Sequence, residues 1–187
     1  MYTVLANELT ILATAQNDPS AFAAVYDHYF GPVYNYVRYR VPDATQAEDL
    51  TAQIFERVLT NLGAFDSQQA TFAVWLFTVA RNLVTDHLRA QKRRRWFSFS
   101  LEQASEQPQS VPLPEEQVIR GETQEALLAA LANLSDRERD LVALKFVAQM
   151  TNRRIAESTG LSESNVGVIL YRALARLREQ LQLSYEA

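Results

Sequence analysis

The sequence predicts an all-α protein made of two small helical domains joined by a flexible linker. The chain has 187 residues, which suits one mid-sized domain or two small ones. Its five glycines and six prolines leave long stretches in which apolar residues recur with a helical period. Residues 98–117 break this pattern, because they are polar and hold half of the prolines. We therefore place one domain at 1–97, a linker at 98–117 and a second domain at 118–187.

The first domain is expected to contain five helices. Asp18 followed by Pro19 predicts the start of the second helix, as N-cap and first helical residue. Pro32 predicts the end of that helix. Thr45 and Glu48 predict a capping box at the start of the fourth. The expected ranges are 3–16, 19–31, 33–39, 46–62 and 71–94.

The second domain is expected to begin with a helix over 118–134. Ser135 and Glu138 then form a predicted capping box for the next helix, whose apolar residues include Leu141 and Val147. Two further helices follow, so this domain is also all-helical.

Residues 152–171 have the spacing of a helix-turn-helix. Ala156 is small where two helices must approach closely, and Gly160 suits the positive φ of the turn. Val166 then holds the second helix, expected from about Ser162 onward, against the core. A three-helix bundle with a glycine turn gives the same pattern, so a purely structural role stays open. In a DNA-binding version the second helix enters the major groove.

Basic charge is concentrated in one segment. The formal net charge of −4 does not by itself suggest a nucleic-acid partner, yet residues 81–97 carry six basic side chains and one acidic. A local basic stripe can bind phosphates whatever the overall charge, although an exposed helix face gives the same pattern. Phe72 and Trp75 precede this stripe, and they fit either a hydrophobic core or base stacking. Aromatic rings beside a cationic track are typical of single-stranded nucleic-acid binding.

Several function classes are disfavoured. The chain has no cysteine, which excludes disulfides, thiol nucleophiles and cysteine zinc sites. Its two histidines, His28 and His87, lie far apart, which argues against a histidine-rich metal site. We expect no metal, no cofactor and no catalytic residue. The sequence has no phosphate-binding glycine loop. It also has neither an apolar run of about 20 residues nor a signal peptide, so we expect no membrane insertion and a cytoplasmic protein.

The order of these parts resembles an extracytoplasmic-function (ECF) RNA polymerase sigma factor of the sigma-70 family. Each motif alone is weak, but their joint order and spacing are specific, and together they cover almost the whole chain. They are found at 47–55, 75–82, 86–89, 134–139, 155–166 and 171–178. The resemblance implies that 1–97 is sigma domain 2 and 118–187 is sigma domain 4, and that the linker replaces the middle domain of housekeeping sigma factors.

The resemblance also implies partners and site residues. The partners are core RNA polymerase through its β and β′ subunits, promoter DNA and an anti-sigma factor. The implied polymerase-binding residues are Glu48, Asp49, Gln53 and Phe55. Those implied for the −10 element are Phe65, Trp75, Arg81, Asn82, Asp86, Arg89, Lys92, Arg93, Arg94 and Arg95. Those implied for the −35 element are Arg153, Arg154, Ser162, Ser164, Asn165, Val168, Tyr171, Arg172 and Arg176.

One departure from the family pattern concerns the helix expected to read the −35 element. Gly167 and Val168 stand where relatives carry polar or basic residues, and no Lys or Arg lies between Ser162 and Tyr171. Each phosphate contact contributes close to one unit to the salt dependence of binding, so this unit alone should bind DNA weakly. We therefore hypothesise that promoter choice depends more on the −10 domain.

Other functions remain in competition with a sigma factor. A free-standing helix-turn-helix regulator with an N-terminal sensor or dimerisation domain would explain the second domain. It would not explain the basic, aromatic segment 71–96. An enzyme lacks motif support, and a family member turned adaptor or anti-sigma protein is a further alternative. Binding to core polymerase separates the first two hypotheses.

Overall fold

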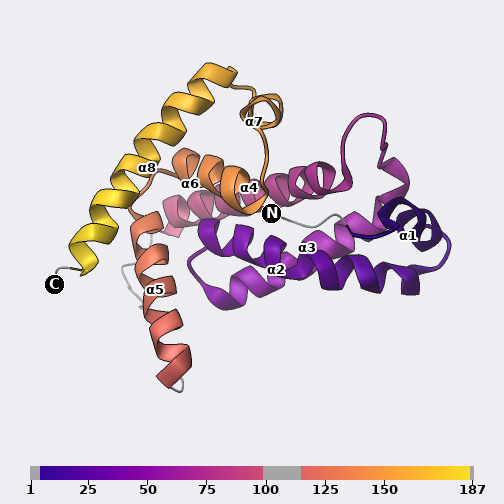
Figure 1. The fold of residues 1–187 in the computed structure, drawn as a ribbon, viewed down its shortest axis with the longest axis horizontal. Coiled ribbons are helices and arrows are strands. Elements are labelled where there is room, and N and C mark those ends of the chain that lie inside the picture. The colour runs from indigo at the N-terminus through magenta and orange to yellow at the C-terminus, as the bar shows by residue number, and fades with distance from the viewer. Residues whose placement is uncertain (1–4, 99–114, 186–187) are drawn as a thin grey trace.

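The computed structural model describes residues 5–98 and 115–185, with side chains described for 5–94 and 124–181. All regular elements in this part of the chain are helical, which confirms the predicted all-α class (Figure 1). The N-terminal half contains α1 (Glu8–Ala15), η1 (Pro19–Phe22), α2 (Ala23–Arg40), α3 (Ala44–Thr60), η2 (Leu62–Ala64) and α4 (Phe72–Ser98). The C-terminal half contains α5 (Glu115–Ala132), α6 (Asp136–Val142), η3 (Ala143–Val147), α7 (Asn152–Thr159) and α8 (Glu163–Tyr185).

Helices α2, α3 and α4 form the core of the N-terminal half. Helix α3 buries Leu50, Ile54 and Val58, which lie one turn apart on a single face. That face packs between α2 and α4, where Val33 and Leu76 are fully buried. The regular apolar spacing therefore determines which face of α3 points inward, and it leaves the opposite face free for a partner.

Helix α2 does not end at Pro32, so the prediction of two separate helices there was wrong. Pro32 lies inside α2, whose buried residues include Tyr29, Val33 and Tyr36 on either side of it. Proline removes one backbone hydrogen bond and crowds the preceding turn. The buried side of α2 continues from Tyr29 to Val33 across the proline. The packing of this side therefore outweighs the tendency of Pro32 to end the helix.

Helix α3 begins two residues earlier than predicted, and with a different cap. The side chain of Asp43 accepts a hydrogen bond from the backbone N–H of Gln46 at 2.7 Å, which makes Asp43 the N-cap. Thr45 and Glu48 therefore lie inside the first turns of the helix and do not form the expected capping box. Aspartate is among the preferred N-cap residues, and sequence alone does not rank two adjacent candidates.

Three other local predictions are confirmed. Asp18 caps η1 by accepting a hydrogen bond from Ser20 N at 3.0 Å. Ser135 and Glu138 form the reciprocal capping box at the start of α6. Gly160 ends α7 with φ of 73°, in the left-handed region that glycine enters without cost.

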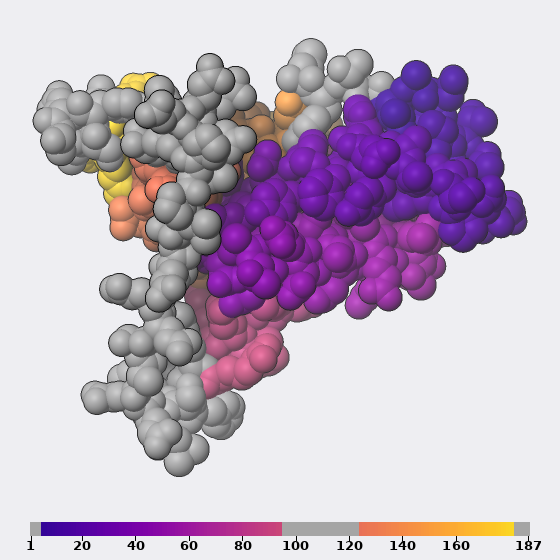
Figure 2. All heavy atoms as spheres, turned by 90° about the horizontal axis from the view of Figure 1, so that it is seen from below, coloured from indigo at the N-terminus to yellow at the C-terminus, as the bar shows by residue number. Residues whose placement is uncertain are grey.

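The two halves of the chain pack against each other. Helices α5 and α6 and the π-helical turn η3 all contact α2. Figure 2 shows the N-terminal helices as one continuous surface, and Figure 1 shows α5 and α8 at the end away from α1. The predicted linker falls largely on residues 99–114, which lie outside the described residues, and α5 already begins at Glu115.

Within the described ranges no helix is both long and apolar enough to cross a membrane. The same ranges bring together no group of three or more acidic or histidine side chains suited to a metal ion.

Candidate nucleic-acid interface

Three aromatic rings meet where the loop before α4 joins that helix. The ring centroids of Phe65 and Phe72 are 5.5 Å apart, and Trp75 lies 5.6 Å from Phe65 and 5.8 Å from Phe72. Phe72 is buried, so this ring belongs to the hydrophobic core, which was one of the two roles predicted for it. Phe65 and Trp75 are only partly buried, and they present aromatic surface beside the start of α4.

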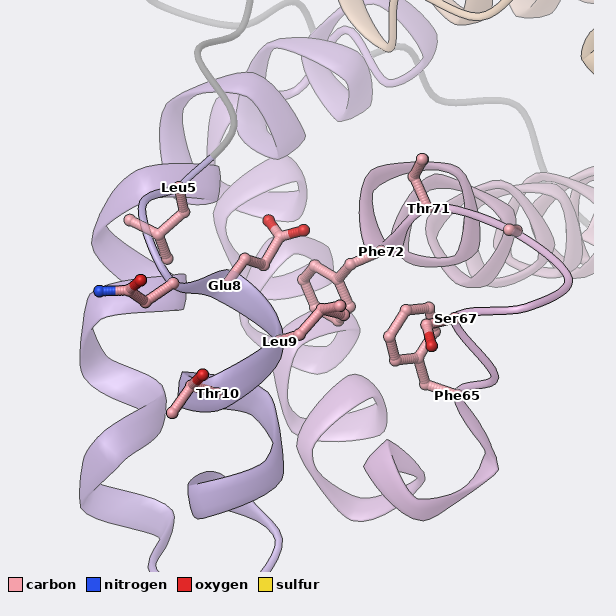
Figure 3. Close-up of a pocket in the computed structure, with 10 residues that line it drawn as sticks. Leu5, Glu8, Leu9, Thr10, Phe65, Ser67, Thr71 and Phe72 are labelled. Atoms are coloured by element: carbon pink, nitrogen blue, oxygen red, sulfur yellow. The ribbon is translucent and has the colours of Figure 1, made fainter.

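A hollow of about 410 Å³ lies between the rings of Phe65 and Phe72 and helix α1 (Figure 3). Leu5 and Leu9 line it from the α1 side, and Phe65 and Phe72 line it from the α4 side. Tyr29 Oη donates a hydrogen bond to Glu8 Oε1 at 2.6 Å, which ties α1 to α2 beside the hollow. The sequence did not indicate this hollow, because it depends on how α1 packs. Its volume and apolar lining are in the range of small-ligand sites.

The predicted cationic track lies on the exposed second half of α4. The exposed residues there are Asn82, Asp86, Arg89, Lys92, Arg93 and Arg94. The side chain of Arg95 lies outside the described residues. Arg89 Nη1 is 3.7 Å from Asp86 Oδ1, and both side chains are highly exposed, so this ion pair contributes little to stability. The exposed charges of Arg89 and Arg93 can therefore reach a phosphate backbone.

Arg81 differs from the rest of the predicted −10 set, because it is already engaged. Its Nε donates to Asp140 Oδ2 at 2.9 Å, and its Nη1 donates to the carbonyl oxygen of Ser158 at 2.9 Å. Both acceptors belong to the C-terminal half. In this arrangement the Arg81 guanidinium points toward the other half of the chain, and DNA cannot reach it without displacing these contacts.

Asp140 is the centre of a buried cluster made of Tyr36, Arg40, Arg81 and Asp140, here called the Asp140 cluster. Tyr36 Oη donates to Asp140 Oδ1 at 3.0 Å and accepts from Arg40 Nη1 at 3.2 Å. Arg40 also forms an ion pair with Asp140 directly, and these two side chains are 4% and 7% exposed. Burial, and then the charge of Asp140, raises the pKa of Tyr36 far above its usual value, so the phenol stays protonated as a donor.

Two further contacts join the two halves, each through a cation predicted to bind DNA. Lys92 on α4 forms an ion pair with Asp136 on α6, and the hydrogen bond from Lys92 lowers the pKa of Asp136. Arg154 Nη2 on α7 donates to the carbonyl oxygen of Gln69 at 3.2 Å, in the loop before α4. These contacts were not predicted, since nothing in the sequence pairs residues so far apart.

The helix-turn-helix is formed by α7 and α8 as the spacing predicted. Val166 and Ala173 are fully buried, and they hold α8 against its neighbours. Ser162 Oγ accepts from Asn165 N at 3.2 Å, so Ser162 helps to cap α8. Val168 and Tyr171 are 47% and 77% exposed and therefore lie on the open face of this helix.

The remaining residues predicted for the −35 element also reach the surface. Ser164, Asn165 and Arg172 are exposed on α8. Three arginines are paired within the C-terminal half: Arg153 and Arg154 with Glu157, and Arg176 with Glu138. A Cβ added at Gly167 would meet only Asn152 Nδ2, at 3.8 Å. Packing therefore does not require a glycine there.

Helix α3 carries the predicted polymerase-binding residues, and one of them is corrected here. Glu48, Asp49 and Gln53 are exposed. Phe55 is only 4% exposed, and its ring centroid is 4.7 Å from that of Tyr26. It therefore packs α3 against α2 and cannot contact a partner directly, because the same α3 face that carries Ile54 and Val58 is buried.

Exposed aromatic residues on α2 were missed by the sequence analysis. Tyr26 and Phe30 are 38% and 37% exposed, and their ring centroids are 5.3 Å apart. Tyr26 contacts α3 through the buried ring of Phe55. The sequence signal for this pair is the four-residue spacing of Tyr26 and Phe30, which places both rings on one side of a helix.

Comparison with known families matches the two halves separately. Residues 25–94 match the family described as Sigma-70 region 2, and residues 124–177 match Sigma-70, region 4. These matches define a protein built from two sigma-70 regions. Helix α1, with the wall of the hollow that it forms, precedes the first match.

Related proteins indicate which group of sigma-70 proteins the chain resembles. The chain is 34% identical over 165 residues to the ECF RNA polymerase sigma factor BldN of Streptomyces coelicolor, covering 88% of this chain and 61% of that protein. It is 28% identical over 168 residues to the ECF RNA polymerase sigma factor SigX of Bacillus subtilis, covering 88% of this chain and 86% of that protein. The chain belongs to the sigma-70 family, in its ECF group.

Solved structures share the fold at low sequence identity. The sigma factor RpoE from Bartonella quintana, in a co-crystal with the anti-sigma factor NepR, superposes with a TM-score of 0.67 at 20% identity. That match covers 86% of this chain and 96% of the other. CnrH, in complex with the cytosolic domain of CnrY, gives a TM-score of 0.62 at 19% identity, over 93% and 96% of the two chains.

Proposed function

We propose that this chain is an alternative sigma factor that binds core RNA polymerase, recognises promoters and opens the −10 element. The observation that carries the proposal is that region 2 and region 4 matches occur in order on one chain, each with an exposed surface suited to DNA. We assign it no catalysis of its own and place it in the cytoplasm, where its polymerase partner acts.

The N-terminal half would bind the melted −10 strand. Exposed cations at Arg89, Lys92 and Arg93 would follow the phosphate backbone, and Phe65 and Trp75 would stack against bases. The hollow beside Phe65 offers a place for an unstacked base, whose extrusion is cheapest in single-stranded DNA. We keep Phe72 as a core residue that supports the other two rings.

The C-terminal half would read the −35 element through α8. Asn165 offers an amide for hydrogen bonds to base edges, and Val168 offers a methyl surface for thymine. Arg153 and Arg172 would hold phosphates at the rim. Because α8 presents few cations in the groove, we propose that this half contributes less to binding than the −10 half.

Core polymerase would bind along the outer face of α3 and the neighbouring edge of α2. Glu48, Asp49 and Gln53 would supply the polar contacts, and Tyr26 and Phe30 would supply apolar ones. The start of α3 meets the second half of α4, where Gln91 donates a hydrogen bond to Gln46, so this surface would border the α4 cations. Because the solved structures of similar fold are complexes with an anti-sigma factor and with the cytosolic domain of CnrY, we also propose control by a partner protein of that kind.

Run-off transcription with core polymerase tests the proposal. Fragmented genomic DNA is transcribed with and without the chain, and the 5′ ends are mapped. We expect new discrete starts that share an upstream motif. Absence of both new starts and core binding would favour a free-standing DNA-binding regulator. Tight core binding without new starts would favour an adaptor.

A matched pair of variants then tests the α3 surface. Glu48→Lys and Asp49→Lys reverse exposed charges on the proposed contact face, so core binding should fall at least about tenfold. Glu179→Lys makes the same charge change at an exposed residue of α8, outside the proposed contact surface, and should leave core binding unaffected. Equal losses in all three variants would assign the effect to net charge.

A further inference from the structure

The Asp140 cluster joins the halves by placing an acid from the C-terminal half among donors from the N-terminal half. Tyr36, Arg40 and Arg81 direct their donors to the two oxygens of one carboxylate. Carboxylate and phosphate are recognised by arginine in the same planar, two-oxygen geometry. The three donors thus form an anion site whose present occupant belongs to the same chain.

We propose that Tyr36, Arg40 and Arg81 form a phosphate-binding site for the −10 strand, and that Asp140 occupies this site when the two halves are packed together. The proposal rests on the proposed function, and it adds a DNA-contacting residue, Arg40, and an internal competitor, Asp140. A phosphate of the promoter strand and the Asp140 carboxylate would then exclude each other.

Burial gives the first argument. Arg40 and Asp140 are 4% and 7% exposed, so in the packed arrangement no other anion can reach these donors. Separating the halves would expose Arg40 and Arg81 to solvent and leave their donors without the Asp140 carboxylate. The same donors could then bind another anion, and DNA phosphate supplies one.

Position gives the second argument. Arg81 lies on α4, the helix that carries the exposed cations Arg89, Lys92 and Arg93. Arg81 lies eight positions before Arg89, which is about 12 Å along the axis and roughly 80° around it. The anion site therefore lies nearer the start of α4 than the exposed cations do, on the side of the helix that faces the C-terminal half.

The other contacts between the halves act in the same direction. Arg81 also donates to the carbonyl of Ser158, and Arg154 donates to the carbonyl of Gln69. Lys92 is paired with Asp136. Closure therefore engages cations that both DNA surfaces would need, so a strand bound along α4 and the packed arrangement compete for the same side chains.

The test compares binding of the full-length free chain to an oligothymidylate strand, followed by fluorescence anisotropy. Asp140→Asn keeps the shape of the side chain and removes its charge, so affinity should rise at least about tenfold. In the Asp140→Asn background, Arg40→Gln should weaken binding and reduce the salt slope by about 0.7, the value for one phosphate contact on a single strand. Asp27→Asn, an exposed acid on α2, is the charge-matched control and should change affinity less than about twofold.

Small-angle scattering of the same proteins separates opening from binding. Asp140→Asn should be more expanded than the wild type. An expanded variant without tighter DNA binding would overturn the phosphate site, and an unchanged affinity with an unchanged shape would overturn the competition. If Asp140→Asn fails to fold by circular dichroism, Asp136→Asn at the exposed contact should still raise affinity by a smaller factor, and no rise there would also overturn the proposal.

Failure of the proposed function is detected by a different readout. Run-off transcription with core polymerase uses the holoenzyme, in which the binding of free chain plays no part. Transcription by the wild type together with unchanged DNA binding in Asp140→Asn would refute only the inference about the Asp140 cluster. Absence of transcription by both proteins would refute the sigma-factor assignment.

Discussion

The two predicted DNA-binding surfaces of this chain differ in charge and in how far they are covered. The α4 surface is rich in exposed arginines and lysine, and its Arg81 and Lys92 are engaged by the C-terminal half. The α8 surface presents Val168 and Tyr171, which are uncharged and highly exposed. Charge gives affinity that depends on salt, whereas contacts to base edges give specificity. We therefore expect the α4 surface to supply most of the affinity. Closure engages Arg81 and Lys92 on α4, and on the other surface Arg154.

The largest expected effect comes from removing charge on α4. Replacing Arg89, Lys92 and Arg93 together by glutamine should lower single-strand affinity by one to two orders of magnitude and reduce the salt slope by about 2. The measurement is anisotropy across a salt series. The same number of charges removed at Arg153, Arg172 and Arg176 provides the comparison, and an equal loss of single-strand binding there would contradict the assignment of the track to α4.

A smaller loss is expected from Trp75→Ala. Stacking of one base on an aromatic ring contributes about 1–3 kcal/mol by alanine substitution, and the salt slope should not change because no phosphate contact is lost. Holoenzyme binding to −10 single strands measures this. Trp75→Phe keeps an aromatic ring and should retain most of the affinity. Similar losses in both variants would indicate that Trp75 has a packing role.

A substitution at Gly167 tests whether the α8 surface needs a glycine at this position. Since an added Cβ meets only Asn152 at an ordinary contact distance of 3.8 Å, Gly167→Ala should raise the free energy of unfolding by about 1 kcal/mol. Chemical denaturation measures the change. Gly160→Ala, at a φ of 73°, is the control and should be destabilising. A destabilised Gly167→Ala would show that α8 needs the glycine.

The smallest expected effect is a loss of stability in acid. The hydrogen bond from Lys92 lowers the pKa of Asp136, and for Glu138 the effect of burial is outweighed by hydrogen bonds from Ser135 and the charge of Arg176. Groups with lowered pKa values stabilise the fold above their unfolded values, near 4, and lose that contribution as pH falls through the folded values. The free energy of unfolding should therefore fall below about pH 5. Asp136→Asn should make this fall shallower, and an unchanged pH profile in that variant would contradict the contact with Lys92.

Local features of the fold were largely predictable, and contacts between distant segments were not. The caps at Asp18 and Ser135 and the turn at Gly160 follow from residue chemistry within a few positions. The break expected at Pro32 failed because burial along α2 outweighs one missing hydrogen bond.

The candidate site divides in the same way. Exposed cations on α4 and exposed residues on α8 follow from helical spacing, which sequence reveals. The burial of Phe55 and the pairing of Arg40 with Asp140 depend on how helices from far apart in the chain meet. The local sequence pattern carries no information about such pairs. An arginine at the end of an amphipathic helix, such as Arg40, would be predicted to be exposed.

Transcription by the holoenzyme from hybrid promoters tests the difference between the two surfaces most directly. A promoter mapped for this chain is altered in its −10 element alone or in its −35 element alone, and run-off product is measured for each. The account predicts that the −10 replacement lowers product by a clearly larger factor, because α4 supplies most of the DNA affinity. An equal or greater loss on −35 replacement would contradict it and would place promoter selection on α8.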